Sequence, residues 1–177
     1  TLLMHTDPLD SEGPKLYAMV EILDIKMGKQ PMISNDKNYV IVYNGEIYNF
    51  VELREELEEK GCRFKSRSDT EVILHAYDIW GIDAIRKLNG MFAFALYDLK
   101  KKQLILARDR FGEKPLYYYV NRDLLIFASE LKAIKHHPRF SASIASDLAL
   151  PYVVWGNFPC PGTIFEDTKK LPPAHYL

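Results

Sequence analysis

The polar triplet Asn44-Gly45-Glu46 directly follows the apolar run "YVIVY" and offers groups that could hold a ligand. Asn-Gly between apolar runs is a strong hairpin signal, because both residues tolerate positive φ. A hairpin needs a return strand, however, and only "EIY" separates Gly45 from Asn49, where a helix is expected to begin. The alternative is a strand end at which the Asn44 side chain and the Gly45 N–H face a ligand, because a residue without Cβ allows close approach.

The other residues suited to chemistry also have purely structural explanations. Asp69 falls in the first turn of an expected helix, where a carboxylate complements the helix dipole by about 0.3–1 kcal/mol. The stretch "ARDRFGEKPLYYY" (107–119) is typical of a solvated charged loop followed by an aromatic strand. Cys62 and Cys160 are too few for a disulfide framework and lack the spacing of a zinc site. No G-x-S-x-G, Walker A or H-E-x-x-H motif occurs, so spacing alone identifies no reaction.

The periodicity of apolar residues predicts the elements that must position these groups. One helix is expected to begin at Asn49, with Asn49 as its N-cap and Glu52 completing a capping box. A second capping box pairs Ser68 with Glu71 at the start of a helix that ends at Gly81, and a shorter helix follows over 82–88. Strands are expected at 15–25, 39–43, 63–67, 90–98, 103–109, 115–120 and 124–129. Two early helices on many short strands indicate a layered protein with mainly antiparallel sheets.

Composition restricts the class of protein further. The 177 residues are close to one domain in length, with 47% hydrophobic and 27% charged residues. The formal net charge of −1 gives no basic excess for binding nucleic acid or an anionic membrane surface. No apolar run is long enough to span a bilayer, and the N-terminus does not have the pattern of a signal peptide. A cytoplasmic location is therefore expected.

Several long motifs in register, taken together, resemble a known family. They are "QPM", "YVIVYNGEIYNFVELREEL", "SDTEVILHAY", "LNGMFAFALYD", "ARDRFGEKPLYYY", "FASELKAI" and "FPCPGTIFEDTKKLPPAHYL". Over residues 20–177 the chain resembles the glutaminase domain of glutamine-hydrolysing asparagine synthetase, a class II glutamine amidotransferase. The resemblance implies an α+β fold, a four-layer α/β/β/α sandwich of two mainly antiparallel sheets of the N-terminal-nucleophile hydrolase type. It also implies a glutaminase-type domain over 15–158 and a linker over 159–177, while the acidic, Pro- and Gly-containing composition of residues 1–14 predicts an irregular segment.

The same resemblance implies roles for the polar triplet. In the family, an N-terminal thiol attacks the side-chain amide of glutamine, with the free α-amino group as base, and water resolves the thioester. By resemblance, the Asn44 side chain and the Gly45 N–H form the oxyanion hole. Glu46 and Asp69 match the positions that hold the ammonium group of glutamine.

The N-terminal part departs from the family pattern. The chain begins "TLLMHT" where the family begins with Cys, and the segment before Asn44 is shorter than in the family. The family's "RLSIID", whose Arg clamps the glutamine carboxylate, corresponds to "MVEILD", so Met19 stands in place of that Arg while Ile22 and Leu23 remain candidates for the glutamine site. We therefore expect N-terminal strands to be missing and the chain alone to be inactive.

Three hypotheses remain open from the sequence. The first is an amidotransferase domain whose Cys-initiated N-terminus is absent from this sequence. The second is a non-catalytic module that binds an amino acid or a partner, and the third uses Thr1 as the nucleophile. The resemblance implies glutamine and a C-terminal synthetase domain as partners, with a homodimer as a further option. It implies no metal and no cofactor here, since ATP and Mg²⁺ would serve only the synthetase domain, which amidates aspartate.

Overall fold

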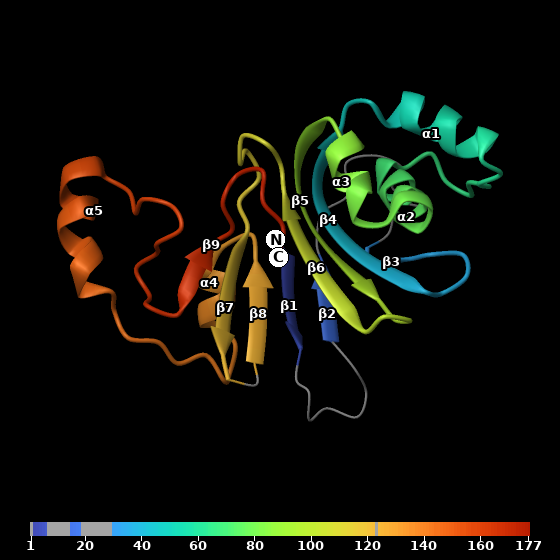
Figure 1. The fold of residues 1–177 in the computed structure, drawn as a ribbon. Helices are drawn as coiled ribbons and strands as arrows, with labels where there is room; N and C mark the ends of the chain where they lie inside the picture. Colours follow the sequence, from blue (N-terminus) through green and yellow to red (C-terminus); the bar gives the residue numbers. More distant parts are fainter. Residues whose placement is uncertain (1, 7–14, 19–29, 123) are drawn as a thin grey trace.

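The computed structural model describes residues 2–6, 15–18, 30–122 and 124–177, which form two antiparallel sheets stacked face to face (Figure 1). Helices α1, α2 and α3 cover the outer face of one sheet, and α4 packs against β7 and β8 on the outer face of the other. This α/β/β/α layering confirms the α+β sandwich of mainly antiparallel sheets that the sequence predicted.

The five-stranded sheet has the strand order β2-β1-β8-β7-β9. Within it, Phe127 faces the layer between the two sheets, whereas Ile126 and Ala128 face the outer side and pack against α4. This alternation follows from the two-residue period of a strand. The strands are β1 (Leu2–Thr6), β2 (Lys15–Ala18), β7 (Tyr117–Asn121), β8 (Leu124–Ala128) and β9 (Thr168–Lys170).

The four-stranded sheet, of order β3-β4-β5-β6, carries the polar triplet on β4. Ile41, Tyr43 and Ile47 face the helices and belong to the larger buried cluster. Val42, on the opposite face of β4, packs in the layer between the sheets. The strands are β3 (Met32–Ile33), β4 (Tyr39–Ile47), β5 (Gly90–Asp98) and β6 (Gln103–Arg108).

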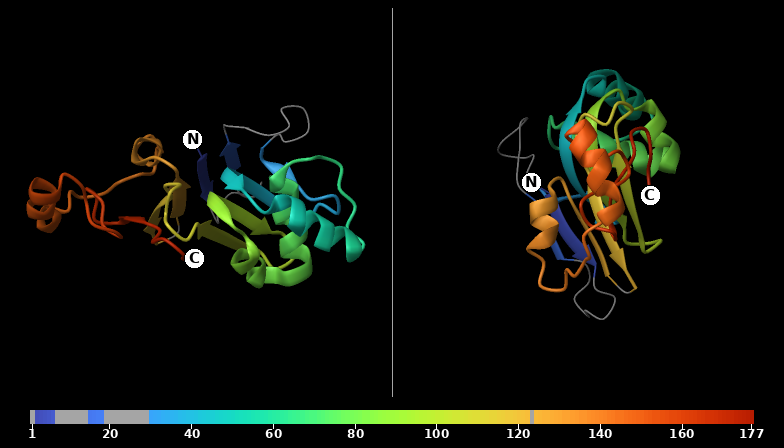
Figure 2. Two further views of the ribbon diagram at one scale, coloured as in Figure 1. Left: turned by 90° about the horizontal axis from the view of Figure 1, so that it is seen from above. Right: turned by 90° about the vertical axis from the view of Figure 1, so that its left-hand side faces the viewer.

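The helices follow the apolar periodicity of the sequence, and the three expected between 49 and 88 are confirmed. Leu53 and Leu57 bury one face of α1, while α2 is buried along most of its length. A fifth helix, α5, lies apart from the sheets at one end of the molecule (Figures 1 and 2). The helices are α1 (Phe50–Glu59), α2 (Asp69–Trp80), α3 (Ala84–Lys87), α4 (Leu131–Lys135) and α5 (Ala149–Trp155).

The start of α1 differs from the capping box expected there. Asn49 is the N-cap residue, but its side chain makes no capping hydrogen bond. Instead its amide donates to Lys87 O at 3.0 Å and accepts from Asn89 N at 2.9 Å. The side chain therefore fastens the β4–α1 connection to the segment that leads into β5, because a tertiary partner competes successfully with the local cap.

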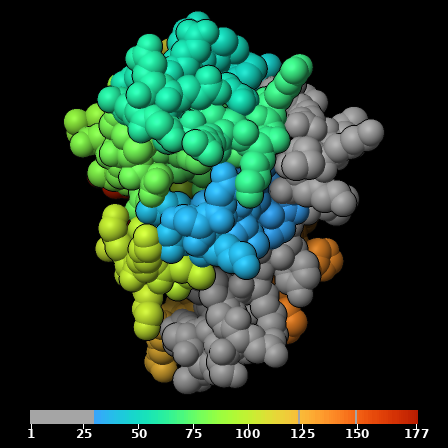
Figure 3. Space-filling view, turned by 90° about the vertical axis from the view of Figure 1, so that its right-hand side faces the viewer, coloured from blue at the N-terminus to red at the C-terminus, as the bar shows by residue number. Residues whose placement is uncertain are grey.

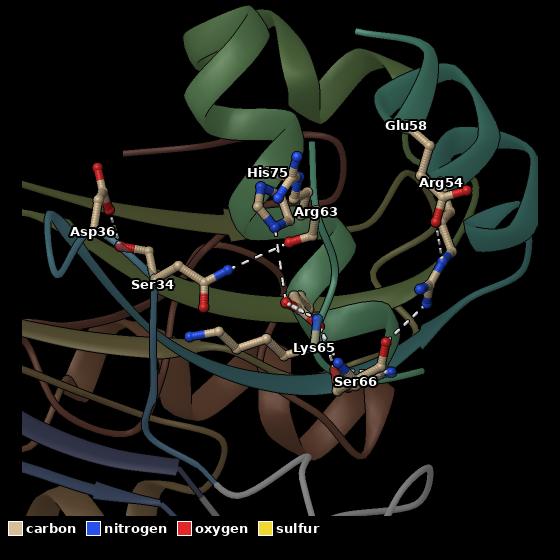
Figure 4. Close-up of polar contacts among 11 residues, drawn as sticks. Ser34, Asp36, Arg54, Glu58, Arg63, Lys65, Ser66 and His75 are labelled. Atoms are coloured by element: carbon tan, nitrogen blue, oxygen red, sulfur yellow. Dashed lines mark hydrogen bonds and ion pairs between the residues drawn. The ribbon is translucent and has the colours of Figure 1, made fainter. Parts of the chain in front are cut away.

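The stretch 63–67 is a loop rather than the expected strand, because side chains satisfy its backbone (Figure 4). The Arg54 guanidinium donates to Ser66 O at 2.8 Å. The Glu71 carboxylate accepts from Lys65 N at 2.9 Å and from Ser66 N at 2.7 Å. The loop is thus fixed in place and leads into the first residue of α2, Asp69.

Both ends of the chain are more regular than the sequence predicted. Leu2–Thr6 forms β1, paired with β2 and β8, so an irregular segment over 1–14 is wrong for these residues. Residues 159–177, for which a linker is predicted, pack on the domain, since Thr168–Lys170 pairs with β7 and Leu177 exchanges 2.9 Å backbone hydrogen bonds with Leu106 on β6. One C-terminal segment therefore contacts both sheets.

The charged loop that follows β6 is solvated at Arg110, Phe111 and Glu113, as the sequence predicted, but it is organised around one buried carboxylate. Asp109 is 1% exposed, and its carboxylate accepts from the backbone N–H groups of Phe92, Phe111, Glu113 and Lys114 at 3.0–3.2 Å. Burial acts to raise the pKa of Asp109, but these donors outweigh it and the pKa is lowered. Asp109 therefore stays ionised and folds the loop around itself.

Candidate active site

Asn44 and Gly45 lie within a continuous strand, so the hairpin interpretation is wrong. β4 runs through to Ile47 and stays paired with β5, with Asn44 opposite Ala93 and Gly45 opposite Phe92. The polar triplet thus lies near the C-terminal end of β4, followed by Ile47 and then by the short connection to α1. This is the strand-end arrangement left open as the alternative.

Gly45 is required by the close approach of β4 and β5. A Cβ atom at Gly45 would lie 2.1 Å from Met91 O and 2.7 Å from Phe92 Cα, and the residue has φ +157°. On the partner strand, a Cβ at Gly90 would lie 2.1 Å from Glu46 O. Both positions therefore exclude any side chain, as expected where two backbones meet closely.

Within the described residues, the outer edge of β4 has no strand partner at the triplet and is called the open edge here. β3 pairs only through Met32 with Ile41 and Ile33 with Val40, and no other described strand follows on this side. In an antiparallel ladder, alternate residues direct their N–H groups to opposite sides. Tyr48 N bonds to Asn89 O in the direction of β5, so the odd-numbered residues direct their N–H groups to the open edge.

Of three outward N–H groups at this edge, two have acceptors. Tyr43 N donates to Gln30 Oε1 at 2.6 Å, and Ile47 N donates to Asp69 Oδ2 at 3.0 Å. The Gly45 N–H, which the strand alternation places between them, has no acceptor among the described residues. Because buried backbone donors are rarely left unpaired, an open donor at a half-buried position is the feature of a ligand site.

Asp69 reaches this edge from the first residue of α2. Its side chain is buried, with the residue 3% exposed, and Oδ2 also accepts from the Tyr43 hydroxyl at 2.6 Å. Burial, and then the charge of Asp69, raise the pKa of Tyr43 far above its usual value. The phenol therefore stays protonated and donates to Asp69 throughout the physiological pH range.

Asn44 and Glu46 lie on the other face of β4 from Tyr43. The two-residue period of the strand places them with Val42, toward the layer between the sheets, where β4 contacts β1 and β2. Both are half-buried, and neither side chain has a hydrogen-bond partner within the described part of the chain. An amide and a backbone N–H suit an oxyanion, and the carboxylates of Glu46 and Asp69 suit a cation.

Comparisons with known proteins agree with this geometry. Residues 17–177 match the model of the glutamine amidotransferase domain. The chain belongs to this family. Asparagine synthetase [glutamine-hydrolyzing] 3 of Bacillus subtilis (strain 168) is 43% identical over all of this chain, which covers 31% of that protein. A putative asparagine synthetase [glutamine-hydrolyzing] 2 of Methanocaldococcus jannaschii is 37% identical over 96% of this chain and 38% of the relative.

Two solved structures share the fold. Glutamine phosphoribosylpyrophosphate amidotransferase from B. subtilis, complexed with ADP and GMP, has a TM-score of 0.52 at 28% identity, over 60% of this chain and 25% of that one. The allosteric regulatory enzyme of purine biosynthesis gives 0.54 at 28% identity, over 62% and 25%. These matches confirm the resemblance to the glutaminase domain of asparagine synthetase. The chain spans well under half the length of the relatives it matches.

The glutamine amidotransferase domain brings four of the predicted site residues to one strand edge. Asn44, Gly45 and Glu46 come from β4, and Asp69 comes from α2. Ile22 and Leu23 lie outside the described residues. Sequence reasoning missed Gln30 and Tyr43. The Gln30 side chain bonds to a main-chain N–H, and the hydroxyl of Tyr43 bonds to Asp69, which is 26 positions away. Neither a local pattern nor the residue type indicates such contacts.

A separate pocket of about 640 Å³ lies between α2 and residues 32–40, segments seen side by side in Figure 3. It is lined by Tyr39, Glu71 and His75 among others, but by none of the four site residues above. Within the described residues, no group of three or more His, Cys, Asp or Glu could hold a metal ion. No helix of the described chain is long and apolar enough to cross a membrane.

Proposed function

We propose that this domain binds glutamine at the open edge of β4 and hydrolyses its side-chain amide. The single observation that carries the proposal is the Gly45 N–H, which has no acceptor among the residues that the structure describes, although Tyr43 N and Ile47 N on either side have one. With the Asn44 amide beside it, this donor would stabilise the tetrahedral intermediate of acyl transfer. Removing one such donor typically lowers the rate by about 10²–10³-fold.

The carboxylates define the orientation of the substrate in this proposal. Asp69 and Glu46 approach the edge from opposite faces of β4, so a cationic group can sit between two negative charges. We assign them to the α-ammonium group of glutamine, and we keep Ile22 and Leu23 as candidates for contacts to the rest of the substrate. The amide carbon then faces the Gly45 N–H.

The nucleophile must come from elsewhere, because neither cysteine lies on an element that forms the site. Cys62 follows α1 and packs against the helix-covered core, where burial raises the pKa of its thiol. Cys160 is exposed in the segment before β9. We therefore propose that turnover requires a Cys-initiated N-terminal segment, which this sequence does not contain, with its α-amino group as base.

We further propose that the domain works within a longer polypeptide as the ammonia source of an asparagine synthetase. The similarity to proteins named glutamine-hydrolysing asparagine synthetases supports this proposal. In such a protein the ammonia would amidate aspartate on a C-terminal domain that uses ATP and Mg²⁺, while the domain described here needs no cofactor. A cytoplasmic location and a homodimer belong to the same proposal.

Two measurements test the proposed function: glutamine binding by calorimetry, and ammonia release from glutamine. We expect this chain to bind glutamine without releasing ammonia, and a version with a restored Cys-initiated N-terminus to release it. Asn44→Ala in the restored version should lower ammonia release by about 10²-fold. Lys102→Ala, an exposed turn residue between β5 and β6, is the control and should leave it unchanged.

The alternatives give different results in the same assays. Glutamine binding with no ammonia from either version would favour the non-catalytic module, because the binding groups would be retained without chemistry. Ammonia release by this chain that disappears in Thr1→Ala would assign the nucleophile to Thr1. Absence of both binding and turnover in the restored version would refute the proposed function.

A further inference from the structure

We propose that Tyr43 is a positioning residue that organises both halves of the glutamine site. This inference rests on the proposed function and deepens it. The residue touches no substrate. It acts through its main-chain N–H, which Gln30 holds, and through its hydroxyl, which orients Asp69.

The main-chain half concerns the shape of the open edge. β3 begins at Met32, opposite Ile41, and Tyr43 is the first outward residue of β4 beyond that pair. The Gln30 carboxamide takes the place of a strand partner there, accepting from Tyr43 N at 2.6 Å. Tyr43 N and Ile47 N both have acceptors, so the Gly45 N–H between them is left without one among the described residues, and a bonded neighbour on each side fixes its position.

The side-chain half concerns the two oxygens of Asp69. Oδ2 accepts from both the Tyr43 hydroxyl and Ile47 N, at 2.6 and 3.0 Å. Oδ1 accepts no hydrogen bond from the described residues, so one oxygen holds the structure and the other is left for an ammonium group. Without the phenol, the carboxylate is free to rotate about its Cβ–Cγ bond and loses this division of roles.

Tyr39 provides a matched control on the same strand. Its hydroxyl donates to Asp78 Oδ1 at 2.9 Å, again from β4 to a carboxylate on α2. Burial raises the pKa of Tyr39 as it does that of Tyr43. Tyr39 lies opposite Asp98 at the far end of β4, away from the polar triplet. Removing either hydroxyl breaks one phenol–carboxylate bond, but only the Tyr43 bond reaches the site.

The ligand test compares glutamine with glutaric acid monoamide, the same molecule without its α-amino group. Calorimetry on this chain should show that Tyr43→Phe weakens glutamine binding by about tenfold, the loss expected when a charge-assisted contact is disordered. The affinity for glutaric acid monoamide should change by less than about twofold. The ratio of the affinity for glutamine to the affinity for glutaric acid monoamide should therefore fall in Tyr43→Phe and stay unchanged in Tyr39→Phe. Equal effects of the two substitutions on that preference would overturn the proposal.

A second readout needs no ligand and separates this proposal from the proposed function. In amide hydrogen exchange, Tyr43 and Ile47 should be protected at least about tenfold more than Gly45. Gln30→Ala should release the Tyr43 amide and leave Ile47 protected, whereas Tyr43→Phe should release Ile47. If the exchange results hold but glutamine does not bind, the proposed function fails while the positioning geometry stands. If Gly45 is as protected as its neighbours, the positioning proposal is wrong whatever binds.

Discussion

At the scale of single residues, the site depends on the absence of a side chain at Gly45. The missing side chain lets the backbone of β4 approach that of β5, and the Gly45 N–H has no acceptor among the described residues. Asn44 and Glu46 add polar groups on one face of the strand, and Asp69 adds a carboxylate from the other. The resemblance in the sequence indicated these four residues, because each belongs to a motif.

The sequence could not indicate Tyr43 and Gln30 as parts of the site. Tyr43 ends an apolar run and reads as a core residue, which its 4% exposure bears out. Its function depends on a hydroxyl partner 26 positions away and on a side-chain amide that replaces a strand. Contacts of this kind are set by tertiary structure, and no local periodicity records them.

Substituting Gly45 by alanine tests the close approach directly. The added Cβ would collide with the backbone of Met91, which cannot move without parting β4 from β5. We expect Gly45→Ala to lower the free energy of unfolding by about 2–4 kcal/mol, as strained or overpacked sites do. Urea denaturation followed by circular dichroism measures it.

Gly156→Ala is the control for backbone strain without a collision. Gly156 has φ +67°, and a Cβ there would meet no atom within 4 Å. Its substitution should therefore cost only about 1 kcal/mol, the penalty for a left-handed alanine. Similar losses in both variants would show that φ, rather than contact with β5, sets the requirement at position 45.

At the scale of elements, the first turn of α2 joins the site to the loop before it. Asp69 points to the edge of β4, and Glu71, two residues later, points back to the 63–67 loop. The capping Ser68 accepts from Thr70 N at 3.2 Å, as the sequence predicted, but Glu71 does not complete the box. The helix boundaries were predictable from periodicity. The loop was not, because its apparent strand pattern is overridden by Glu71 and Arg54.

Acid stability tests the role of Glu71 in this turn. Burial acts to raise the pKa of Glu71, but the nearby His75 ring, 3.8 Å away, and hydrogen bonds from Ser66 and Lys65 outweigh it and lower the pKa from 4.5 to about 2. A carboxyl with a depressed folded-state pKa stabilises the protein above its unfolded pKa. That stabilisation is lost as the pH falls from about 4.5 through about 2.

We expect Glu71→Gln to lower the free energy of unfolding by up to about 3 kcal/mol at pH 6, and by progressively less as the pH falls toward 2. Urea denaturation at several pH values measures this convergence. Glu58→Gln is the control, because Glu58 pairs with Arg54 on the exposed side of α1 and should change stability by less than about 0.5 kcal/mol. A difference between wild type and Glu71→Gln that stays constant with pH would contradict the assignment.

At the scale of the whole molecule, the C-terminal segment fastens the two sheets together. Its β9 part pairs with β7 of one sheet, and Leu177 bonds to Leu106 of the other. Between them Leu171 is buried in the layer between the sheets, and the Arg108 guanidinium donates to Leu171 O at 2.7 Å. The Pro-rich composition of this segment indicated a linker. Its packing was not predictable, because the strands with which it pairs lie far away in sequence and the segment has no apolar periodicity of its own.

Leu171→Ala distinguishes a packed segment from a linker. Leu171 is 3% exposed, so its truncation leaves a cavity between the sheets and should lower the free energy of unfolding by about 2–5 kcal/mol. Leu150→Ala makes the same chemical change on α5, where the side chain is 72% exposed, and should stay within about 0.5 kcal/mol of wild type. Urea denaturation measures both. If residues 159–177 were detached, both substitutions would be neutral. A loss confined to Leu171 would therefore establish that the packed sandwich extends into this segment.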